Sequence, residues 1–392
     1  MDIRIIPGKL QGNIAAIPSK SQAHRLLICA AFADQETTLI CPDTNRDIEA
    51  TAGCLRSLGA QILRTDRGYT VKPITNIPET ASLNCEESGS TLRFLLPIAG
   101  ALGVDTTFRM AGRLPYRPLS PLWEEMERMG CQLSRPTENT IRCCGKLCSG
   151  AYQIDGGVSS QFITGLLFAC ALMDGESHIS ITGHLESRPY VDMTLDALKL
   201  FQRTVHDFTI TAGRFVSPGE MAVEGDWSNA AFFLAANALG SEIRVDNLNF
   251  GSSQGDMACH SLFRKLAEPL VISCGDIPDL VPILSVVAAA KCGASFENIR
   301  RLRLKESDRV ASVIAMLSSL GCDATATEDT LTVLPGKFQG GTVDACGDHR
   351  IAMAAAIAAT IAQSPVTILG AECVSKSYPA FWDEFKRLGG KI

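Results

Sequence analysis

Basic side chains gather where the apolar segments of this chain begin. They fall in or beside short polar clusters, at Lys20, Arg25, Arg93, Arg117, Arg309, Arg350 and Lys376. Several, Arg25, Arg93 and Arg350 among them, are expected in the first turns of helices, where the helix dipole disfavours a cation by up to about 1 kcal/mol. An anion bound in front of these helices would balance that charge. The sequence therefore predicts a site for a small, highly anionic ligand.

The same clusters hold hydroxyl and amide groups. Ser159, Ser160 and Gln161 place two hydroxyls and an amide beside the free backbone N–H groups of a helix start, which suits a bound phosphate. Helix capping is the simpler alternative, and Ser88 or Ser228 taken singly fits that role. Capping does not explain the basic residues, so both interpretations stay open here.

Two acids stand among the cations. Asp279 is placed where a buried helix is expected to begin and is also a good capping residue. Glu306 is expected to open a helix over residues 305–321 and to lie on its buried stripe. Burial would raise the pKa of the Glu306 carboxyl, while Lys305 and Arg309 oppose that rise. A carboxyl in this setting suits a proton donor to carbon, and stabilisation of the first helical turn is the alternative.

The polar clusters recur at one structural position along the chain. Each precedes an alanine-rich apolar segment and is followed by a second, amphipathic one, which predicts a buried helix and then a one-sided helix. The clusters start at Pro18, Glu87, Gly157, Gly225, Ile277 and Gly347. A self-similar period of about 70 residues is longer than that of common solenoids and indicates six copies of a compact α/β unit. Short β-branched runs at 242–248 and 330–335 are expected to be strands.

Length and cluster positions predict two domains. A chain of 392 residues exceeds what one hydrophobic core usually supports, so we expect an α/β fold with three repeated units in each domain. The fourth cluster places the domain boundary near Val223, and the opening strand, residues 2–14, is assigned to the second half. The predicted domains are residues 15–223 and residues 1–14 together with 224–392.

Composition excludes several classes of protein. A net charge of −6 argues against a nucleic-acid binder. The longest apolar run, 351–362, is shorter than the roughly 20 residues that cross a bilayer, so no membrane association is expected. The first residues also lack the pattern of a signal peptide.

Cysteine usage points to a reducing compartment. The 15 cysteines form no CxxC pair, and Cys29, Cys170, Cys292 and Cys322 are expected to be reduced core residues of a cytoplasmic protein. A metal site at Cys143, Cys144 and Cys148 is not expected, because no histidine lies near them in the sequence.

Nine short strings carry a resemblance to a known family. In chain order they are PSKSQAHR, SGSTLRF, GRLPYRPLSPL, the triplet Ser159–Gln161, ESRPY, IPD, LKESDR, GDHR and VSKSYP. Together they resemble the 5-enolpyruvylshikimate-3-phosphate synthase family of enolpyruvyl transferases, and the match covers nearly the whole chain. The resemblance implies a pair of inside-out α/β barrels that close over the substrates.

The resemblance also implies an activity. The enolpyruvyl group of phosphoenolpyruvate would pass to the 5-hydroxyl of shikimate 3-phosphate, with release of phosphate. It implies a monomer that uses no cofactor, metal, nucleotide or covalent intermediate, and whose partners are these two small molecules.

Site residues follow position by position from the resemblance. Shikimate 3-phosphate would be bound by Lys20, Ser21, Arg25, Ser159, Ser160, Gln161, Ser187, Tyr190, Asp279 and Lys305. Phosphoenolpyruvate would be bound by Lys20, Gly89, Arg117, Gln161, Arg309, Arg350 and Lys376. Glu306 would protonate the methylene carbon of phosphoenolpyruvate, Asp279 would accept the proton of the attacking hydroxyl, and Lys20 would face the developing charge. His349 is expected to be at most a hydrogen-bonding assistant.

The sequence departs from the family pattern at three positions. Glu87 stands where the best-known members carry Asn, Ser90 where they carry Thr, and Arg301 where Asn is frequent. These residues bear on contacts to the sugar ring and to phosphoenolpyruvate rather than on the reaction. Gly89, with no side chain, is expected to leave room for the phosphonate inhibitor glyphosate, with an inhibition constant below the millimolar range.

Three alternatives are weighed against this interpretation. UDP-N-acetylglucosamine enolpyruvyl transferase shares the chemistry but carries a reactive loop cysteine, and none occurs here between Glu86 and Gly130. RNA 3′-phosphate cyclase is disfavoured by the acidic charge and by the lack of an ATP-binding signature. A non-catalytic anion-binding relative would not need both Asp279 and Glu306.

Overall fold

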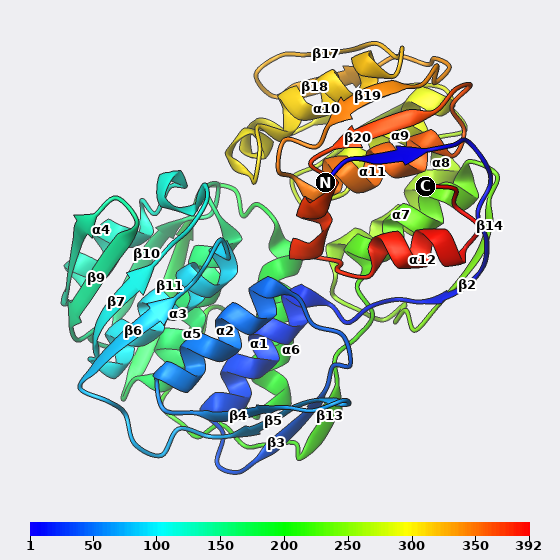
Figure 1. The fold of residues 1–392 in the computed structure, drawn as a ribbon. Coiled ribbons are helices and arrows are strands. Elements are labelled where there is room, and N and C mark those ends of the chain that lie inside the picture. The colour runs from blue at the N-terminus through cyan, green and yellow to red at the C-terminus, as the bar shows by residue number, and fades with distance from the viewer. The chain divides into compact units, whose positions relative to one another are not determined.

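The computed structural model describes all of residues 1–392 (Figure 1). Contacts divide the chain into two compact units. The continuous unit is Lys20–Val223, and the split unit joins Met1–Ser19 to Glu224–Ile392. Buried apolar side chains form a separate core in each unit. The chain passes from the split unit to the continuous unit after Ser19 and returns after Val223.

The continuous unit contains six α-helices and three sheets. The helices are α1 (Lys20–Ala31), α2 (Arg46–Ser57), α3 (Gly89–Leu102), α4 (Leu122–Arg128), α5 (Ser160–Leu172) and α6 (Arg188–Leu200), with a 3₁₀ turn η1 (Leu114–Tyr116). One sheet has the order β13 (Glu220–Ala222), β3 (Thr37–Ile40), β5 (Gly68–Lys72), β4 (Gln61–Arg64). The second is β6 (Thr80–Asn84), β7 (Asp105–Arg109), β9 (Thr140–Gly145), β8 (Cys131–Thr137), and the third is β10 (Ala151–Asp155), β11 (Glu176–Thr182), β12 (Thr209–Thr211).

The split unit also contains six α-helices and three sheets. The helices are α7 (Trp227–Ala238), α8 (Cys259–Lys265), α9 (Val281–Ala290), α10 (Arg309–Ser319), α11 (His349–Ala359) and α12 (Phe381–Arg387), with 3₁₀ turns η2 (Gly255–Ala258), η3 (Arg300–Leu304) and η4 (Ala371–Lys376). The sheets are β1 (Ile3–Ile5), β20 (Val366–Leu369), β19 (Gly341–Asp344); then β14 (Glu242–Asp246), β2 (Gln11–Ala15); and β15 (Leu270–Ser273), β16 (Ala294–Glu297), β18 (Thr330–Val333), β17 (Ala324–Ala326).

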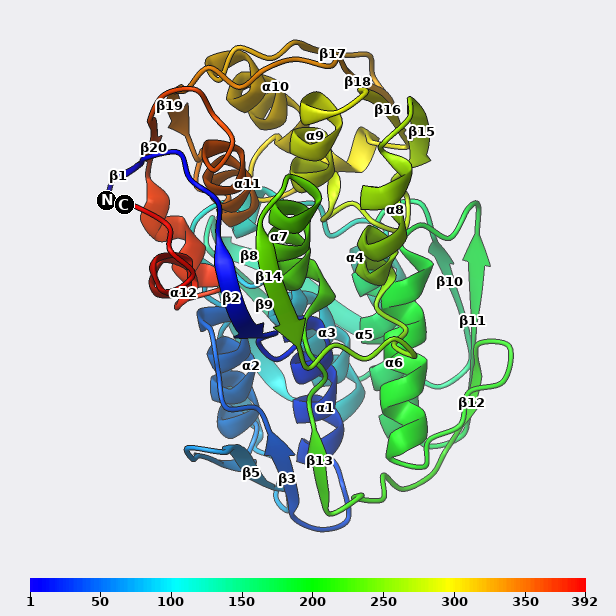
Figure 2. The ribbon, with the colours of Figure 1, turned by 90° about the vertical axis from the view of Figure 1, so that its right-hand side faces the viewer.

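Helix burial follows the sequence pattern. In the split unit, α7, α9 and α11 pack against one another, and Figure 2 shows them side by side. Every residue of α11 is buried, and its alanines both favour a helix and allow neighbouring helices to approach closely. In the continuous unit, α3 packs along α5, and α1 packs against α2 and α6. By contrast, α2, α6 and α10 bury only one face.

The sheet topology explains why the polar clusters share one position. Helices α3, α5, α9 and α11 each connect two parallel strands, as α3 connects β6 to β7 and α11 connects β19 to β20. A parallel pair requires a crossover, and the crossover helix starts just beyond the carboxyl end of the first strand. The residues between that strand and its helix are therefore the polar clusters.

Local predictions were partly corrected. The expected strands at 242–248 and 330–335 are confirmed as β14 and β18. The opening segment forms two strands, β1 and β2, instead of one, because Pro7 and Gly8 interrupt it. Both strands pair within the split unit, with β20 and β14.

The cysteines are all free thiols. Cys29, Cys170 and Cys322 are buried as expected, but Cys292 is exposed, because it lies in the turn that follows α9 and not within the helix. No helix is long and apolar enough to cross a membrane.

Candidate active site

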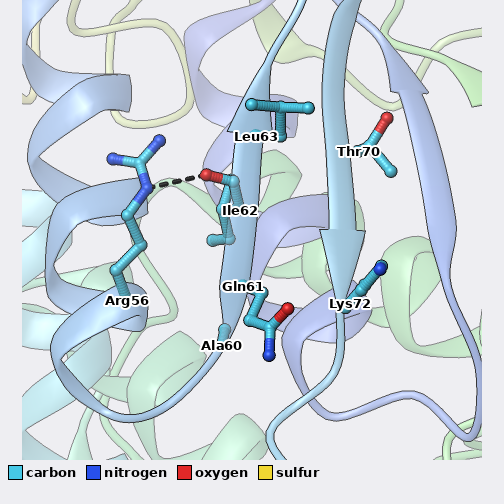
Figure 3. A pocket seen from close by; sticks show the side chains of 7 residues that line it. All are labelled: Arg56, Ala60, Gln61, Ile62, Leu63, Thr70 and Lys72. Carbon is cyan, nitrogen blue, oxygen red and sulfur yellow. Dashed lines mark hydrogen bonds between the residues drawn. The ribbon is translucent and has the colours of Figure 1, made fainter.

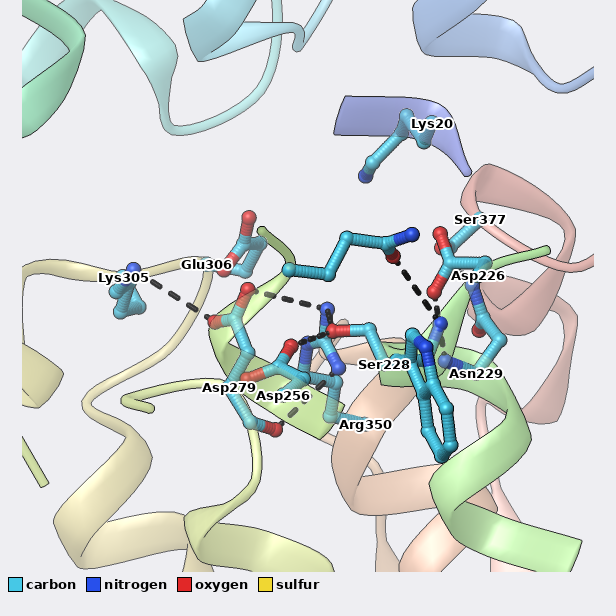
Figure 4. Close-up of polar contacts among 12 residues, drawn as sticks. Lys20, Asp226, Ser228, Asn229, Asp256, Asp279, Lys305, Glu306, Arg350 and Ser377 are labelled. Carbon is cyan, nitrogen blue, oxygen red and sulfur yellow. Dashed lines mark hydrogen bonds and ion pairs between the residues drawn. The ribbon is translucent and has the colours of Figure 1, made fainter. Parts of the chain in front are cut away.

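The carboxylate of Asp279 is the centre of an ion-pair network in the split unit (Figure 4). Its Oδ1 accepts a hydrogen bond from Arg309 Nη1 at 2.7 Å and lies 3.6 Å from Lys305 Nζ. Its Oδ2 accepts from Arg350 Nη2 at 3.1 Å, and Arg350 Nη1 donates to the Asp279 backbone carbonyl at 3.3 Å. Three cations thus converge on one carboxylate.

This arrangement sets the protonation of the network. Burial alone would raise the pKa of Asp279, but Arg350, Lys305 and Arg309 outweigh burial and hold that pKa well below its usual range. Burial lowers the pKa of Lys305 to about 8, against the opposing attraction of Asp279. In the unliganded protein Asp279 is therefore a firmly held anion and a weak base.

Arg309 joins two further acids to the network. It is the first residue of α10, its side chain is 1% exposed, and its Nη2 donates to Glu306 Oε2 at 2.8 Å. Its Nε donates to Asp348 Oδ2 at 3.0 Å. Asp348 is also the N-cap of α11 and accepts from the backbone N–H of Arg350 at 3.0 Å. A buried guanidinium needs such partners, and here they tie the start of α10 to the start of α11.

Glu306 does not occupy the predicted helical position. It lies in a bend between η3 and α10, and α10 begins only at Arg309. The prediction that it shares a helical stripe was wrong because Asp308 takes the N-cap and accepts from Ala311 N at 3.1 Å. The Glu306 side chain is nevertheless only 19% exposed, so it is still largely buried beside Arg309.

The capping interpretation holds for some of the candidate residues and fails for others. Ser88 caps α3 and Ser159 caps α5, so the capping interpretation is confirmed for these two serines. Asp279 does not cap, because α9 starts after Leu280 and the carboxylate is taken by the cations. Ser228 lies inside α7, whose N-cap is Asp226.

The basic residues are also not all in first turns. Lys20 and Arg350 are the first and second residues of α1 and α11. Arg25 and Arg93 fall in second turns, because α1 begins at Lys20 and α3 begins at Gly89. Their long side chains, and not their place on the helix, decide what they contact.

The start of α3 in the continuous unit is a second polar cluster. A Cβ at Gly89 would stand 2.8 Å from Arg117 Nη1 and 3.1 Å from Arg93 Nη1. Arg93 Nη1 donates to Gln161 Oε1 at 2.8 Å, and Gln161 Nε2 donates to the Ser90 hydroxyl at 3.0 Å. The buried Nε of Arg117 has no hydrogen-bond partner. An unsatisfied N–H beside a helix start suits a bound anion.

Arg25 organises a third cluster. It is buried, and it donates from Nη1 to the Ser21 carbonyl at 2.5 Å, from Nη2 to the Tyr190 carbonyl at 2.6 Å and from Nε to Thr194 Oγ1 at 2.9 Å. Burial lowers its pKa to about 10, which still leaves it cationic at neutral pH. Ser187 precedes α6 in a left-handed conformation with φ 55°. Arg25 thus links Ser21 on α1 to Tyr190 on α6, and the Ser187 carbonyl in turn accepts from the backbone N–H of Tyr190.

The remaining predicted site residues are Lys20, Ser160 and Lys376. Lys20 Nζ lies 3.0 Å from Asp47 Oδ2 on α2. Ser160 is the first residue of α5 and is buried. Lys376 ends η4, which packs against α11.

The sequence prediction missed Asp47, Asp256 and Asp348. Asp348 stands in the string GDHR, where a capping residue before two basic ones could have drawn attention. Nothing in the sequence marks Asp47 or Asp256 as partners of the distant Lys20 and Ser228. The structure contains no group of three or more His, Cys, Asp or Glu side chains placed to hold a metal ion.

A surface pocket elsewhere in the continuous unit holds none of the predicted residues. It is formed by β4 and β5 with Arg56 of α2, which donates from Nε to the Ile62 carbonyl at 2.9 Å (Figure 3).

Comparison with known proteins decides the family. The family described as EPSP synthase (3-phosphoshikimate 1-carboxyvinyltransferase) matches residues 5–270 and 267–385. The chain belongs to the EPSP synthase family. A relative from Clostridium acetobutylicum, named 3-phosphoshikimate 1-carboxyvinyltransferase, is 38% identical over 418 residues, covering 100% of this chain and 98% of the relative. A relative of the same name from Clostridium perfringens is 39% identical over 415 residues, covering 98% of each.

Solved structures agree on the fold. The EPSP synthase of Acinetobacter baumannii matches with a TM-score of 0.81 at 23% identity, covering 99% of this chain and 98% of that one. The enolpyruvyl transferase NikO from Streptomyces tendae matches with a TM-score of 0.76 at 16% identity, covering 99% and 97%. The family predicted from the nine strings is therefore confirmed, and the chain has the mixed α/β fold of EPSP synthase.

Proposed function

We propose that this protein transfers the enolpyruvyl group of phosphoenolpyruvate to the 5-hydroxyl of shikimate 3-phosphate and releases phosphate. Membership of the EPSP synthase family, with relatives of that name matching over the full length, supports this activity. The observation that carries the proposed site is the convergence of Lys305, Arg309 and Arg350 on the Asp279 carboxylate. This network provides both cations for an anionic substrate and acids for proton transfer.

We also propose that each unit is an inside-out α/β barrel of three repeats. Supporting this, each unit has three sheets, and nearly fully buried helices alternate along the chain with shorter or one-sided ones. The domains would then be the predicted three-repeat halves, the continuous one binding mainly shikimate 3-phosphate and the split one carrying the acids.

From the continuous unit, we propose two sets of ligand contacts. The cluster around Arg25, with Ser21, Ser187 and Tyr190, would bind shikimate 3-phosphate, together with the α5 start. The residues at the start of α5 are Ser159, Ser160 and Gln161. The α3 start would bind phosphoenolpyruvate through Gly89 and Arg117, with Lys20 and Gln161 facing both ligands.

From the split unit, we propose that Arg309, Arg350 and Lys376 bind phosphoenolpyruvate. Asp279 and Lys305 would contact shikimate 3-phosphate. Arg309 and Arg350 are paired with carboxylates of the chain itself, so the substrate would have to replace those contacts.

The proton transfers follow from this exchange. Glu306 would protonate the methylene carbon of phosphoenolpyruvate, which creates positive charge at the adjacent carbon. Asp279 would accept the proton of the attacking hydroxyl. Because Arg309 and Arg350 hold the pKa of Asp279 low, its basicity should increase when the substrate anion takes over those cations. Elimination of phosphate from the tetrahedral intermediate then reverses the proton transfers.

We further propose a monomeric cytoplasmic protein. Fifteen free thiols fit a reducing compartment. The molar mass of the purified protein, measured by light scattering after size-exclusion chromatography, tests this oligomeric state, and the mass of a dimer would contradict it.

The decisive experiment is phosphate release from phosphoenolpyruvate by purified protein, with shikimate 3-phosphate as acceptor and UDP-N-acetylglucosamine as control. Release that requires shikimate 3-phosphate is expected. Release only with the sugar nucleotide would assign the other enolpyruvyl transferase activity. If no phosphate is released with either acceptor, a non-catalytic anion-binding relative is favoured.

A further inference from the structure

A second carboxylate in the split unit is linked to Arg350 by hydrogen bonds. Asp256, in η2, is 3% exposed and accepts the hydroxyl of Ser228 (Figure 4). The Ser228 oxygen in turn accepts from Arg350 Nη2 at 3.1 Å. The same Nη2 donates to Asp279 Oδ2 at 3.1 Å. Asp256 and Asp279 therefore act on one guanidinium, the first of them through Ser228.

The segment that carries Asp256 is fastened to the start of α7. Gln254 Oε1 accepts from the backbone N–H of Trp227 at 3.2 Å, and Gln254 Nε2 donates to the Gly225 carbonyl at 2.9 Å. Ser228 follows directly in α7. The backbone thus fixes the carboxylate and its hydrogen-bond donor relative to each other, which makes the link to Arg350 a built feature and not a chance contact.

Of the two carboxylates near Arg350, Asp256 is the one whose protonation should change when the surrounding charge changes. It faces the carboxylate of Asp279, the carboxylate of Asp226 at the N-cap of α7, the guanidinium of Arg350 on α11 and the thiol of Cys259 on α8. Burial, followed by Asp279, raises the pKa of Asp256 to about 7 against the effects of Arg350 and Ser228. Asp279 has Lys305 and Arg309 as additional cations and stays ionised.

We propose that Asp256 is a positioning residue that acts through Ser228 to set the affinity of Arg350 for phosphoenolpyruvate, taking up a proton from solvent when that anion binds. This rests on the proposed function, in which Arg350 binds this substrate. A substrate anion at Arg350 adds a third negative group around one guanidinium. Protonation of the Asp256 carboxylate to a neutral carboxyl relieves that repulsion, and Asp279 keeps Lys305 as a cationic partner.

The proton uptake determines in which direction the KM for phosphoenolpyruvate changes with pH. Uptake of a proton on binding means that binding weakens as the pH rises above the pKa of Asp256 in the unliganded protein. The KM for phosphoenolpyruvate should therefore increase from pH 7 to pH 9. Lys305, with its pKa lowered to about 8, also loses charge in this range. The ratio of the wild-type KM to that of Asp256→Asn removes the contribution of Lys305, because both proteins share it.

The test measures KM and kcat for phosphoenolpyruvate between pH 6 and pH 9 in the full-length protein. In Asp256→Asn the increase of KM with pH should be smaller, so that the ratio of wild-type to variant KM grows by about fivefold to tenfold across the range, the lower end of the coupling typical of linked sites. The kcat values at pH 7 should agree within about twofold. A parallel pH profile in the two proteins overturns the proposal.

A second variant covers the case in which Asp256→Asn does not fold. Ser228→Ala keeps the carboxylate but removes the hydrogen bond that lowers its pKa. Because Asp256 acts on Arg350 through Ser228, the increase of KM should then be smaller and begin at higher pH than in the wild type. A pH profile parallel to that of the wild type contradicts the proposal.

Glu125→Gln is the matched control. It neutralises a buried carboxylate of the continuous unit that pairs with Arg128, and it should leave the pH profile parallel to that of the wild type. A wild-type protein that releases no phosphate overturns the proposed function and this inference together. An active wild type whose profile Asp256→Asn does not change overturns only the inference.

Discussion

Replacing Gly89 with alanine tests the proposed phosphoenolpyruvate contact most directly. The new methyl group would stand 2.8 Å from Arg117 Nη1 and 3.3 Å from Arg117 Cζ. Ordinary contact between such atoms is about 3.5 Å, so the guanidinium must move by about 0.7 Å. The move costs little folding energy, because the tip of a flexible side chain moves and the backbone does not.

The magnitude follows from what Arg117 is proposed to do. A charge-assisted hydrogen bond contributes about 1.5–3 kcal/mol, and a displacement of this size should remove about 1 kcal/mol of it. The KM for phosphoenolpyruvate should therefore rise about threefold to tenfold. Gly89 is the first residue of α3 and has no left-handed conformation to lose, so alanine should not lower the stability of the helix.

The assay is steady-state phosphate release with each substrate varied in turn, together with a thermal melt. The matched control is Gly53→Ala, because Gly53 lies in α2 and a Cβ there would meet nothing within 4 Å. The control should leave both KM values unchanged.

Two results would refute the reasoning. An unchanged KM for phosphoenolpyruvate in Gly89→Ala would remove Arg117 from that substrate. An equal rise of both KM values with a lower melting temperature would indicate general damage to the continuous unit.

Three further predictions concern the acids, the inhibitor and the buried histidine. Glu306→Gln and Asp279→Asn should each lower kcat for phosphate release by about 10²–10⁴-fold, and near-normal kcat would exclude that residue from proton transfer. Glyphosate should inhibit competitively with phosphoenolpyruvate, and a millimolar inhibition constant would contradict the space expected at Gly89. Burial lowers the pKa of His24 from 6.5 to about 3, so the unfolded state alone binds this proton between those values. Stability should rise with pH in that window by up to about 1.4 kcal/mol per unit, and His24→Gln should flatten the rise in urea titrations; an unchanged slope would contradict this.

The sequence identified the helix starts because chemistry and topology coincide there. A crossover helix between parallel strands exposes free N–H groups at its start, and the cluster residues needed to cap it or to bind an anion are polar in an otherwise apolar segment. Ser88 and Ser159 could therefore be identified as capping candidates from sequence, and the structure shows that both are caps.

The sequence could not show which partner each polar group takes. Asp279 and Ser228 are as suitable for capping as Asp226, but each makes its contacts with Arg350, which is 71 and 122 residues away. Glu306 was misplaced because Asp308, two residues later, is the N-cap, and the helix begins after it at Arg309. The local sequence shows where a helix can begin. Contacts with residues far along the chain decide whether a given acid caps that helix or pairs with a cation.

The ion-pair network around Asp279 offers an explanation of how a carboxylate with a low pKa could serve as the proposed base. Asp279 is held by Arg350, Lys305 and Arg309, and each of these cations is an equally good partner for a carboxylate or phosphate of the substrate. In the proposed mechanism the substrate would replace Asp279 at Arg309 and Arg350, so two of the three cations that lower the pKa of Asp279 would act on it less, while its burial remains. The proposed base would thus gain strength when the substrate binds.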